Sequence, residues 1–178
     1  MDKVKVLATG QMFLKSPETI LIGRALNELM DETRTELQIV AYRFTTSVQE
    51  FRDSFERVLH RGCNITLVLD QSSPDTDGYS DTYVKSKLKE FKNLTVWDFT
   101  GLQVEGSQKY ISQLHAKTVI SDRKKAVVGS ANFSRNGLLE NHELALLIEG
   151  EKVLTLAKAI DELISNGRLN NSIRQRLV

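Results

Sequence analysis

Two apolar runs separated by one amphipathic segment constrain most strongly how this chain can fold. Residues 36–44 (ELQIVAYRF) are apolar and β-rich, and residues 65–69 form a short, nearly continuous apolar run. Between them, residues 47–60 carry apolar side chains at helical spacing, and Arg61-Gly62 is a typical helix end. A strand, a helix and a strand at this spacing predict a βαβ unit. Because the second run is apolar throughout, we expect a sheet that is covered on both faces.

The remaining segments extend this α/β pattern. Ser16-Pro17 is a good helix start, with Ser as the cap and Pro at the first helical position. The other expected elements are an edge strand at 4–8, helices to about residue 35 and at 81–92 and 151–164, strands at 94–99 and 144–148, and loops at 71–80 and 100–112. The sequence therefore predicts a mixed, largely parallel β-sheet flanked by helices on both faces.

The chain is expected to form a single domain over residues 1–178, with a core at about 17–165. At 178 residues it is long enough to bury roughly 70% of its unfolded surface. Residues 166–178 are a polar, basic tail, compatible with a frayed end, a dimer contact or a nucleic-acid arm. The net charge of +1 neither demands nor excludes nucleic acid, and the one cysteine, Cys63, excludes an internal disulfide.

The N-terminal residues do not resemble a secretory signal, and the sequence contains no run of 18 apolar residues. We therefore expect a cytoplasmic protein with no membrane anchor.

The segment HAKTVIS and the residues after it predict a hairpin that carries reactive side chains. Because side chains alternate along a strand, His115 and Lys117 are expected on the same face. Residues 122–125 are polar and turn-like, and 126–128 are the apolar return strand. The basic residues of the turn are expected to be solvated, at a position that leaves room for a contact to a nucleic-acid backbone.

Small polar side chains follow the return strand. Gly129 ends it, and the missing side chain lets a ligand approach the backbone. Ser130 and Asn132 can donate hydrogen bonds to an anion near the Lys117 ammonium. An imidazole beside such a pocket can act as a nucleophile or as a general acid and base near neutral pH. This set of groups can hold a phosphate and attack it without a metal.

The spacing H-x-K, four residues, D, six residues, G-S-x-N resembles the HKD motif of the phospholipase D superfamily. The matching residues are His115, Lys117, Asp122, Gly129, Ser130 and Asn132. The downstream pair Asn141 and Glu143 also resembles the family's N-x-E pattern. The resemblance implies a phospholipase D-like fold, in which Asp122 and Gly129 are structural rather than chemical.

The same resemblance implies a role for each reactive group. His115 is the expected nucleophile, which attacks phosphorus and forms a phosphohistidine intermediate. Lys117, Ser130 and Asn132 are expected to bind the non-bridging phosphate oxygens. Glu143 matches the carboxylate that accepts a hydrogen bond from the nucleophilic histidine. Family members need no metal, so no cofactor is expected.

One departure from the family reaction shapes the expected assembly. The reaction uses two histidines, whereas this chain has three in all, and neither His60 nor His142 lies in an H-x-K setting. A second G-S-x-N is also missing. We therefore expect a homodimer with one His115 from each protomer and an active site at the two-fold interface.

Three functions are compatible with the sequence. The first is a metal-independent phosphodiesterase that hydrolyses DNA, with RNA as a further substrate, in restriction or in defence against foreign DNA. The second is a phosphodiesterase acting on phosphatidyl or cardiolipin head groups. The third is a non-catalytic nucleic-acid-binding module in a larger complex. The nuclease is favoured, with DNA and a second copy of the chain as the expected partners.

Overall fold

One mixed sheet runs through the structure, a computed structural model that describes residues 2–14, 17–45, 47–71, 78–101 and 112–177. These residues form nine strands in the order β2-β1-β8-β7-β6-β3-β4-β5-β9. The strands are β1 Lys3–Thr9, β2 Ile20–Leu21, β3 Glu36–Ala41, β4 Asn64–Asp70, β5 Leu94–Phe99, β6 Lys117–Ser121, β7 Lys125–Gly129, β8 Glu143–Glu149 and β9 Ile173–Gln175. The helices are α1 Ile22–Glu32, α2 Gln49–His60, α3 Gly78–Glu90 and α4 Lys152–Leu169, with one π-helical turn, η1 Asn136–Glu140.

The predicted βαβ unit is confirmed. Strand β3 pairs in parallel with β4, from Glu36 opposite Asn64 to Ala41 opposite Leu69, and α2 connects the two strands. Strand β5 continues the parallel pairing after α3. Parallel pairing otherwise joins only β1 and β2 in the described sheet, while the other five neighbouring pairs are antiparallel. The expected mixed α/β architecture is present, but the sheet is less parallel than expected because β6, β7 and β8 follow one another antiparallel.

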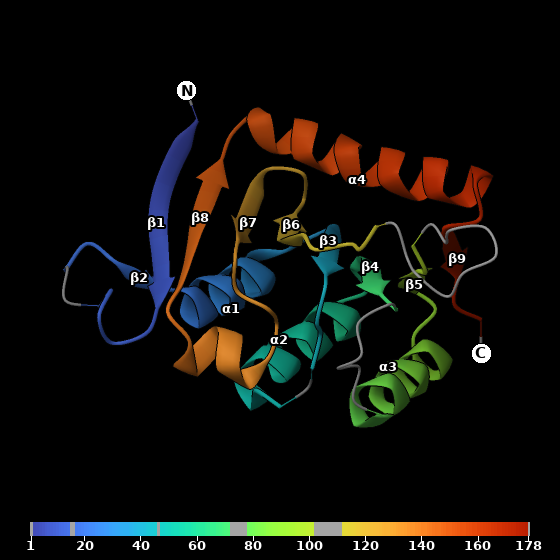
Figure 1. The fold of residues 1–178 in the computed structure, drawn as a ribbon, viewed down its shortest axis with the longest axis horizontal. Helices are drawn as coiled ribbons and strands as arrows, with labels where there is room; N and C mark the ends of the chain where they lie inside the picture. Colours follow the sequence, from blue (N-terminus) through green and yellow to red (C-terminus); the bar gives the residue numbers. More distant parts are fainter. Residues whose placement is uncertain (1, 15–16, 46, 72–77, 102–111, 178) are drawn as a thin grey trace.

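Helices cover both faces of the sheet, as expected. Figure 1 shows α4 on one side of the row of strands and α1, α2 and α3 on the other. The larger core cluster lies under α1, α2 and α3 and contains the whole predicted stripe of α1: Ile22, Ala25, Leu26, Leu29 and Met30. A second cluster lies under α4. Burying one such aliphatic side chain contributes about 1.5–3 kcal/mol, so the two clusters fix the sheet between its helices.

The first helix begins later than the sequence predicts. Pro17 lies in a turn, and α1 starts at Ile22, while Ser16 lies outside the described residues. Ile20 and Leu21 are extended because they pair in parallel with β1. Pairing with the sheet edge therefore overrides the local start signal at Ser16-Pro17.

The C-terminal residues are part of the fold rather than a tail. Helix α4 continues to Leu169, and β9 pairs antiparallel with β5, from Trp97 opposite Gln175 to Phe99 opposite Ile173. The Arg176 side chain is 8% exposed and forms ion pairs with Asp81 and Asp98 at 2.7 and 2.5 Å. A basic composition suggested a solvated tail, but this guanidinium is neutralised by two carboxylates from distant parts of the sequence.

Two predicted loops lie largely outside the described residues, at 72–77 and 102–111. Within the described part of the chain, no helix has both the length and the apolar character needed to cross a membrane.

Candidate active site

The ends of four neighbouring strands bring the predicted reactive residues together. Strand β6 begins at Lys117, opposite Ala41 at the end of β3. Strand β7 ends at Gly129, opposite Ala145 near the start of β8. The residues just before β6, just after β7 and at the start of β8 therefore meet at one end of the sheet. They supply His115, Ser130 and Glu143.

His115 and Lys117 are in direct contact. Lys117 Nζ lies 2.8 Å from His115 Nδ1 and donates a second hydrogen bond to the His115 carbonyl oxygen at 2.7 Å. His115 is exposed, whereas Lys117 is only 5% exposed. Because an ammonium has donors only, a charged Lys117 makes Nδ1 an acceptor, and the neutral imidazole then carries its proton on Nε2. In this contact the Nε2–H of His115 is available to donate a hydrogen bond.

Burial dominates the electrostatics of Lys117. Loss of hydration lowers the pKa of its ammonium, and the negative charge of Glu143 opposes that shift. The Tyr42 ring also faces this pair, with its centroid 5.2 Å from Lys117 Nζ and 4.6 Å from the His115 ring centroid. Sequence reasoning placed Tyr42 within a buried strand and missed it as a site residue. A signal was available, since an aromatic residue at the end of a strand is well placed to meet the end of a neighbouring strand.

Glu143 contacts the serine rather than the histidine. Its carboxylate accepts a short hydrogen bond from the Ser130 hydroxyl and a longer one, of 3.3 Å, from Asn141 Nδ2. The resemblance implied that Glu143 accepts a hydrogen bond from His115, and this contact does not occur among the described residues of the single chain. The reason is geometric, because Lys117 already occupies Nδ1 of the imidazole. The Ser130 hydroxyl proton is likewise committed to Glu143.

Asn132 lies beside this group with an unsatisfied acceptor. Its Oδ1 is buried and has no hydrogen-bond partner in the described structure. The backbone of Asn132 is fixed by close packing, since a Cβ on Gly137 would lie 2.2 Å from the Asn132 carbonyl oxygen. Ser134 N also donates to that oxygen at 2.8 Å. The π-helical turn η1 therefore holds the Asn132 backbone at the sheet end.

Gly129 has a packing role that differs from the expected one. A Cβ at this position would lie 2.4 Å from Ala145 Cβ and 2.5 Å from the Leu144 carbonyl oxygen. The missing side chain therefore allows β7 to approach β8, rather than a ligand to approach the backbone. This close approach places Ser130 beside the start of β8, where Ser130 N donates to the Leu144 carbonyl at 3.0 Å.

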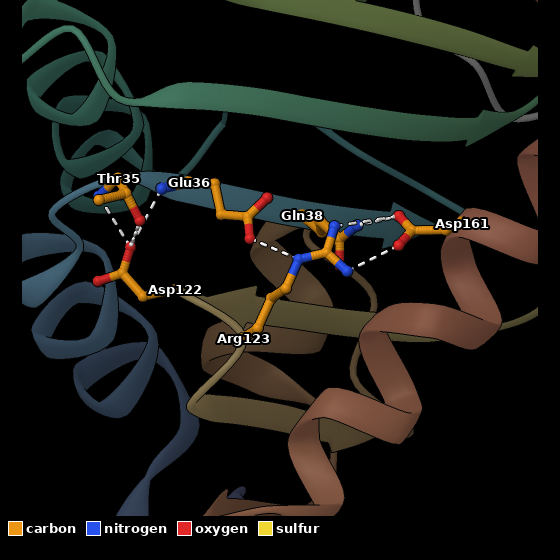
Figure 2. A network of polar contacts seen from close by, with 6 residues as sticks. All are labelled: Thr35, Glu36, Gln38, Asp122, Arg123 and Asp161. Carbon is orange, nitrogen blue, oxygen red and sulfur yellow. Dashed lines mark hydrogen bonds and ion pairs between the residues drawn. The ribbon is translucent and has the colours of Figure 1, made fainter.

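Asp122 lies at the opposite end of β6, about 15 Å along the strand from Lys117. Its carboxylate accepts hydrogen bonds from the backbone N–H groups of Arg34, Thr35 and Glu36 and from the Thr35 hydroxyl, at 2.7–3.0 Å. Figure 2 shows the Asp122 carboxylate hydrogen-bonded to Thr35 and Glu36 at the start of β3. These hydrogen bonds lower its pKa even though burial acts in the opposite direction.

The basic residues of the same turn do not face the site. Arg123 donates to Glu36 at 2.6 Å and to Asp161 at 2.7 Å, and Asp161 also accepts from Gln38 (Figure 2). Lys125 pairs with Glu32 and Glu149. The expected position for a nucleic-acid contact beside the motif is therefore wrong, because the turn is at the far end of the hairpin and two of its cations are already paired.

A buried carboxylate supports the segment that carries His115. Asp70, at the end of β4, is 2% exposed, and its Oδ2 accepts the backbone N–H of Leu114 at 2.5 Å. Sequence reasoning did not single out Asp70, although a charged residue at the end of an apolar strand is a recognisable signal. Within the described residues, no group of three or more His, Cys, Asp or Glu side chains is arranged to hold a metal ion.

The sequence of this chain is similar to a known family and to a known protein. Residues 26–165 match the family model described as "Cardiolipin synthase, PLD-like domain". The chain is 33% identical over 144 residues to DISARM protein DrmC of Bacillus paralicheniformis, covering 79% of this chain and 55% of DrmC. It thus spans about half the length of that relative.

Solved structures share the fold. NucT from Helicobacter pylori superposes with a TM-score of 0.72 at 20% identity, covering 93% of this chain and 97% of NucT. Nuc from Salmonella typhimurium, a phospholipase D family member, gives a TM-score of 0.70 at 19% identity over the full length of both chains. Phosphatidylserine synthase from Haemophilus influenzae gives 0.68 at 14% identity, covering 99% of this chain and 40% of the synthase.

Proposed function

The chain belongs to the phospholipase D-like family, and on that premise we propose that it is a phosphodiesterase that hydrolyses DNA, with RNA as a further substrate, without a metal. One observation carries the proposal: an exposed imidazole is in contact with a buried ammonium at an open end of the sheet. The ammonium supplies a positive charge for a phosphate, and the imidazole supplies a nucleophile and a proton carrier.

The proposed reaction has two steps. Nε2 of one neutral His115 attacks phosphorus, forming an N–P bond as the P–O bond to the leaving group breaks, and a second His115, as imidazolium, gives a proton to the leaving oxygen and becomes neutral. Water then attacks the phosphohistidine, losing a proton to the second His115 and releasing the first. Lys117, with Ser130 and Asn132, stabilises the charge on the non-bridging oxygens.

The attacking imidazole needs its proton on Nδ1, opposite to the form that a charged Lys117 favours. In the proposal, the attacking His115 therefore exchanges Lys117 for a carboxylate acceptor, and Glu143 is the candidate for that role. The contact seen in the single chain suits neither role, because the acid must be an imidazolium with protons on both ring nitrogens, and its Nδ1–H cannot accept from the Lys117 ammonium. The two copies of His115 then differ in protonation rather than in sequence.

A second copy of the chain is part of the proposal, because one chain has one H-x-K segment. An uncovered apolar strip beside the site supports it. Val4, Val6, Leu144 and Leu146 lie on β1 and β8 and are 57%, 53%, 48% and 42% exposed. They share the face that α4 covers elsewhere, since Ile148, opposite Val4, packs in the cluster under α4. Leu144 directly follows Glu143, and because side chains alternate along β8 the strip and the Glu143 carboxylate face opposite sides of the sheet, so a copy seated on the strip reaches the site around the end of the sheet.

The name of the family model favours a second candidate, a lipid phosphodiesterase. The structural likeness to phosphatidylserine synthase, at 14% identity, shows the fold alone. As a nuclease, the chain would act in restriction or in defence against foreign DNA. Because one relative is a DISARM protein, the defence role is the one to test first.

The test compares the wild-type chain with His115→Ala on single-stranded DNA, duplex DNA, RNA and phosphatidylglycerol vesicles, all in EDTA. We expect DNA cleavage by the wild type, with its loss in the variant at an unchanged circular dichroism spectrum. Release of head group without nucleic-acid cleavage would establish the lipid reaction instead. Cleavage by His115→Ala, or cleavage only after Mg²⁺ is added, would contradict the proposal.

A further inference from the structure

We propose that Tyr42 is a positioning residue. Its ring restrains the His115 imidazole and stabilises the Lys117 ammonium in place of a carboxylate counter-ion. The inference rests on the proposed function only in treating His115 and Lys117 as the reacting groups. Its geometric basis is independent of the substrate.

Tyr42 contacts both groups at once. Its ring centroid lies 4.6 Å from that of His115 with an interplanar angle of 52°, and Lys117 Nζ lies 5.2 Å from the Tyr42 centroid. A cation within about 6 Å of an aromatic face is attracted by the ring quadrupole. One half-buried side chain therefore restrains the imidazole by contact and stabilises the ammonium by electrostatics.

The hydrogen bonds of Lys117 explain why an aromatic face is suited to this position. Two of its donated hydrogen bonds go to His115, and no carboxylate of the described residues is within ion-pair distance of Nζ. An ammonium has three N–H donors, so one remains for a ligand. A carboxylate here would take that donor and cancel the charge, whereas a π face stabilises the charge and leaves the donor available to a phosphate oxygen.

The backbone around Tyr42 is fixed on both sides. Ala41 pairs with Lys117, so Tyr42 follows the last residue of β3 that pairs with β6. Beyond it, Phe133 N donates to the Arg43 carbonyl at 3.1 Å, and Thr45 N donates to the Phe133 carbonyl at 2.7 Å. The ring is thus presented by a segment bonded to both strand ends that build the site.

The experiment varies the ring while keeping its shape. Tyr42→Phe keeps the face, Tyr42→Leu removes it, and 4-fluoro- and 3,4,5-trifluorophenylalanine at position 42 weaken its negative charge stepwise. For each chain, kcat and KM for DNA in EDTA and the affinity for inorganic phosphate by calorimetry are measured, with thermal unfolding as the folding control.

We expect Tyr42→Phe to stay within about 2-fold of wild type in both readouts, and Tyr42→Leu to lose about 10-fold in kcat and in phosphate affinity. Each fluorine should weaken both further, which a role in packing alone would not produce. A flat fluorine series, or equal behaviour of Leu and Phe, would overturn the inference. If Tyr42→Leu does not fold, the fluorine series decides.

The two proposals fail separately. DNA cleavage that survives His115→Ala removes the proposed function, and Tyr42 is then judged on phosphate affinity alone. Cleavage that is lost in His115→Ala but unchanged across the Tyr42 series removes only the inference about Tyr42.

Discussion

Lys117 Nζ lies 2.8 Å from Nδ1 of His115, and the lysine that makes this contact is 5% exposed. Burial lowers the pKa of this ammonium, with partial opposition from Glu143. The folded chain therefore releases a proton from Lys117 at lower pH than the unfolded chain does. Between those two pKa values the unfolded state binds more protons, so stability rises with pH there, and below the folded-state pKa the full penalty of the buried charge is present.

Replacing Lys117 by Met should therefore stabilise the fold while removing activity. We expect Lys117→Met to raise the free energy of unfolding at pH 7 by about 1 kcal/mol, since a well-packed apolar side chain often replaces a buried charge with a gain in stability. Hydrolysis should fall by about 100-fold or more, because the positive charge at the phosphate is lost. Urea unfolding and DNA cleavage in EDTA measure the two effects.

Lys124→Met is the matched control for that experiment, since Lys124 is exposed in the turn at the far end of the hairpin. It should change neither stability nor cleavage. A Lys117→Met chain that is less stable than wild type would show that the contacts to His115 and Tyr42 outweigh desolvation.

Asp122 should make the fold sensitive to acid. The pKa of Asp122 is lowered in the folded chain, because the hydrogen bonds that its carboxylate accepts outweigh the effect of burial. Its contribution to stability is therefore present above the ordinary pKa of 3.8 and is lost as pH falls through the folded-state pKa. Asp122→Asn keeps a residue that tolerates the observed φ of 50° but has one acceptor oxygen instead of two. We expect a loss of about 2 kcal/mol at pH 7 that shrinks at pH 3.

Urea titrations at the two pH values measure this difference. Asp53→Asn, at a surface carboxylate that lies 3.7 Å from Arg52 Nε, serves as the control and should be nearly neutral. An Asp122→Asn penalty that is the same at both pH values would mean that the charge of Asp122 contributes nothing.

Sequence and structure agree where local pattern and spacing decide the outcome. The stripe of α1, the strand at 94–99 and the parallel pairing of β3 with β4 follow from periodicity, and the convergence of His115 with Lys117 follows from two-residue alternation. The failures concern partners that are distant in sequence. Position 129 must be glycine because Ala145, sixteen residues away, leaves no room for a side chain. The short strand β2 forms because it pairs with β1.

The site shows the same division. The motif identifies His115, Lys117, Ser130 and Glu143 as residues that meet, and the structure brings them to one end of the sheet. It does not identify which of them bond to each other, because the Ser130–Glu143 contact depends on how closely β7 approaches β8. Tyr42 was missed for the same reason, since its role depends on pairing between β3 and β6.

The apolar strip on β1 and β8 predicts the effect of a charge introduced there. Leu146→Glu should give a monomer in light scattering and lose DNA cleavage, because a carboxylate cannot be buried against a second copy without a partner. Lys3→Glu, on an exposed residue at the end of β1, is the control for charge alone. A Leu146→Glu dimer with normal activity would show that the strip is not the contact.

Hybrid dimers test whether both histidines are needed. When an equal amount of His115→Ala chain is exchanged with wild type, half of the wild-type chains enter hybrids, and activity should fall to about half. As a control, the same amount of a protein that has this fold but does not exchange subunits with the wild type is added. The activity should then stay unchanged. Full activity after demonstrated exchange would mean that one His115 suffices.

Arg176 should contribute strongly to stability although it is one residue from the last one described. Its guanidinium is 8% exposed and pairs with Asp81 and Asp98, whose hydrogen bonds raise its pKa against the effect of burial. Arg176→Met would leave two partly buried carboxylates without their cation, and we expect a loss of about 2–3 kcal/mol in urea unfolding at pH 7. Arg174→Met, at an exposed residue of β9, should change stability by less than about 0.5 kcal/mol. Equal stability of the two variants at pH 7 would show that the ion pairs of Arg176 add nothing to stability.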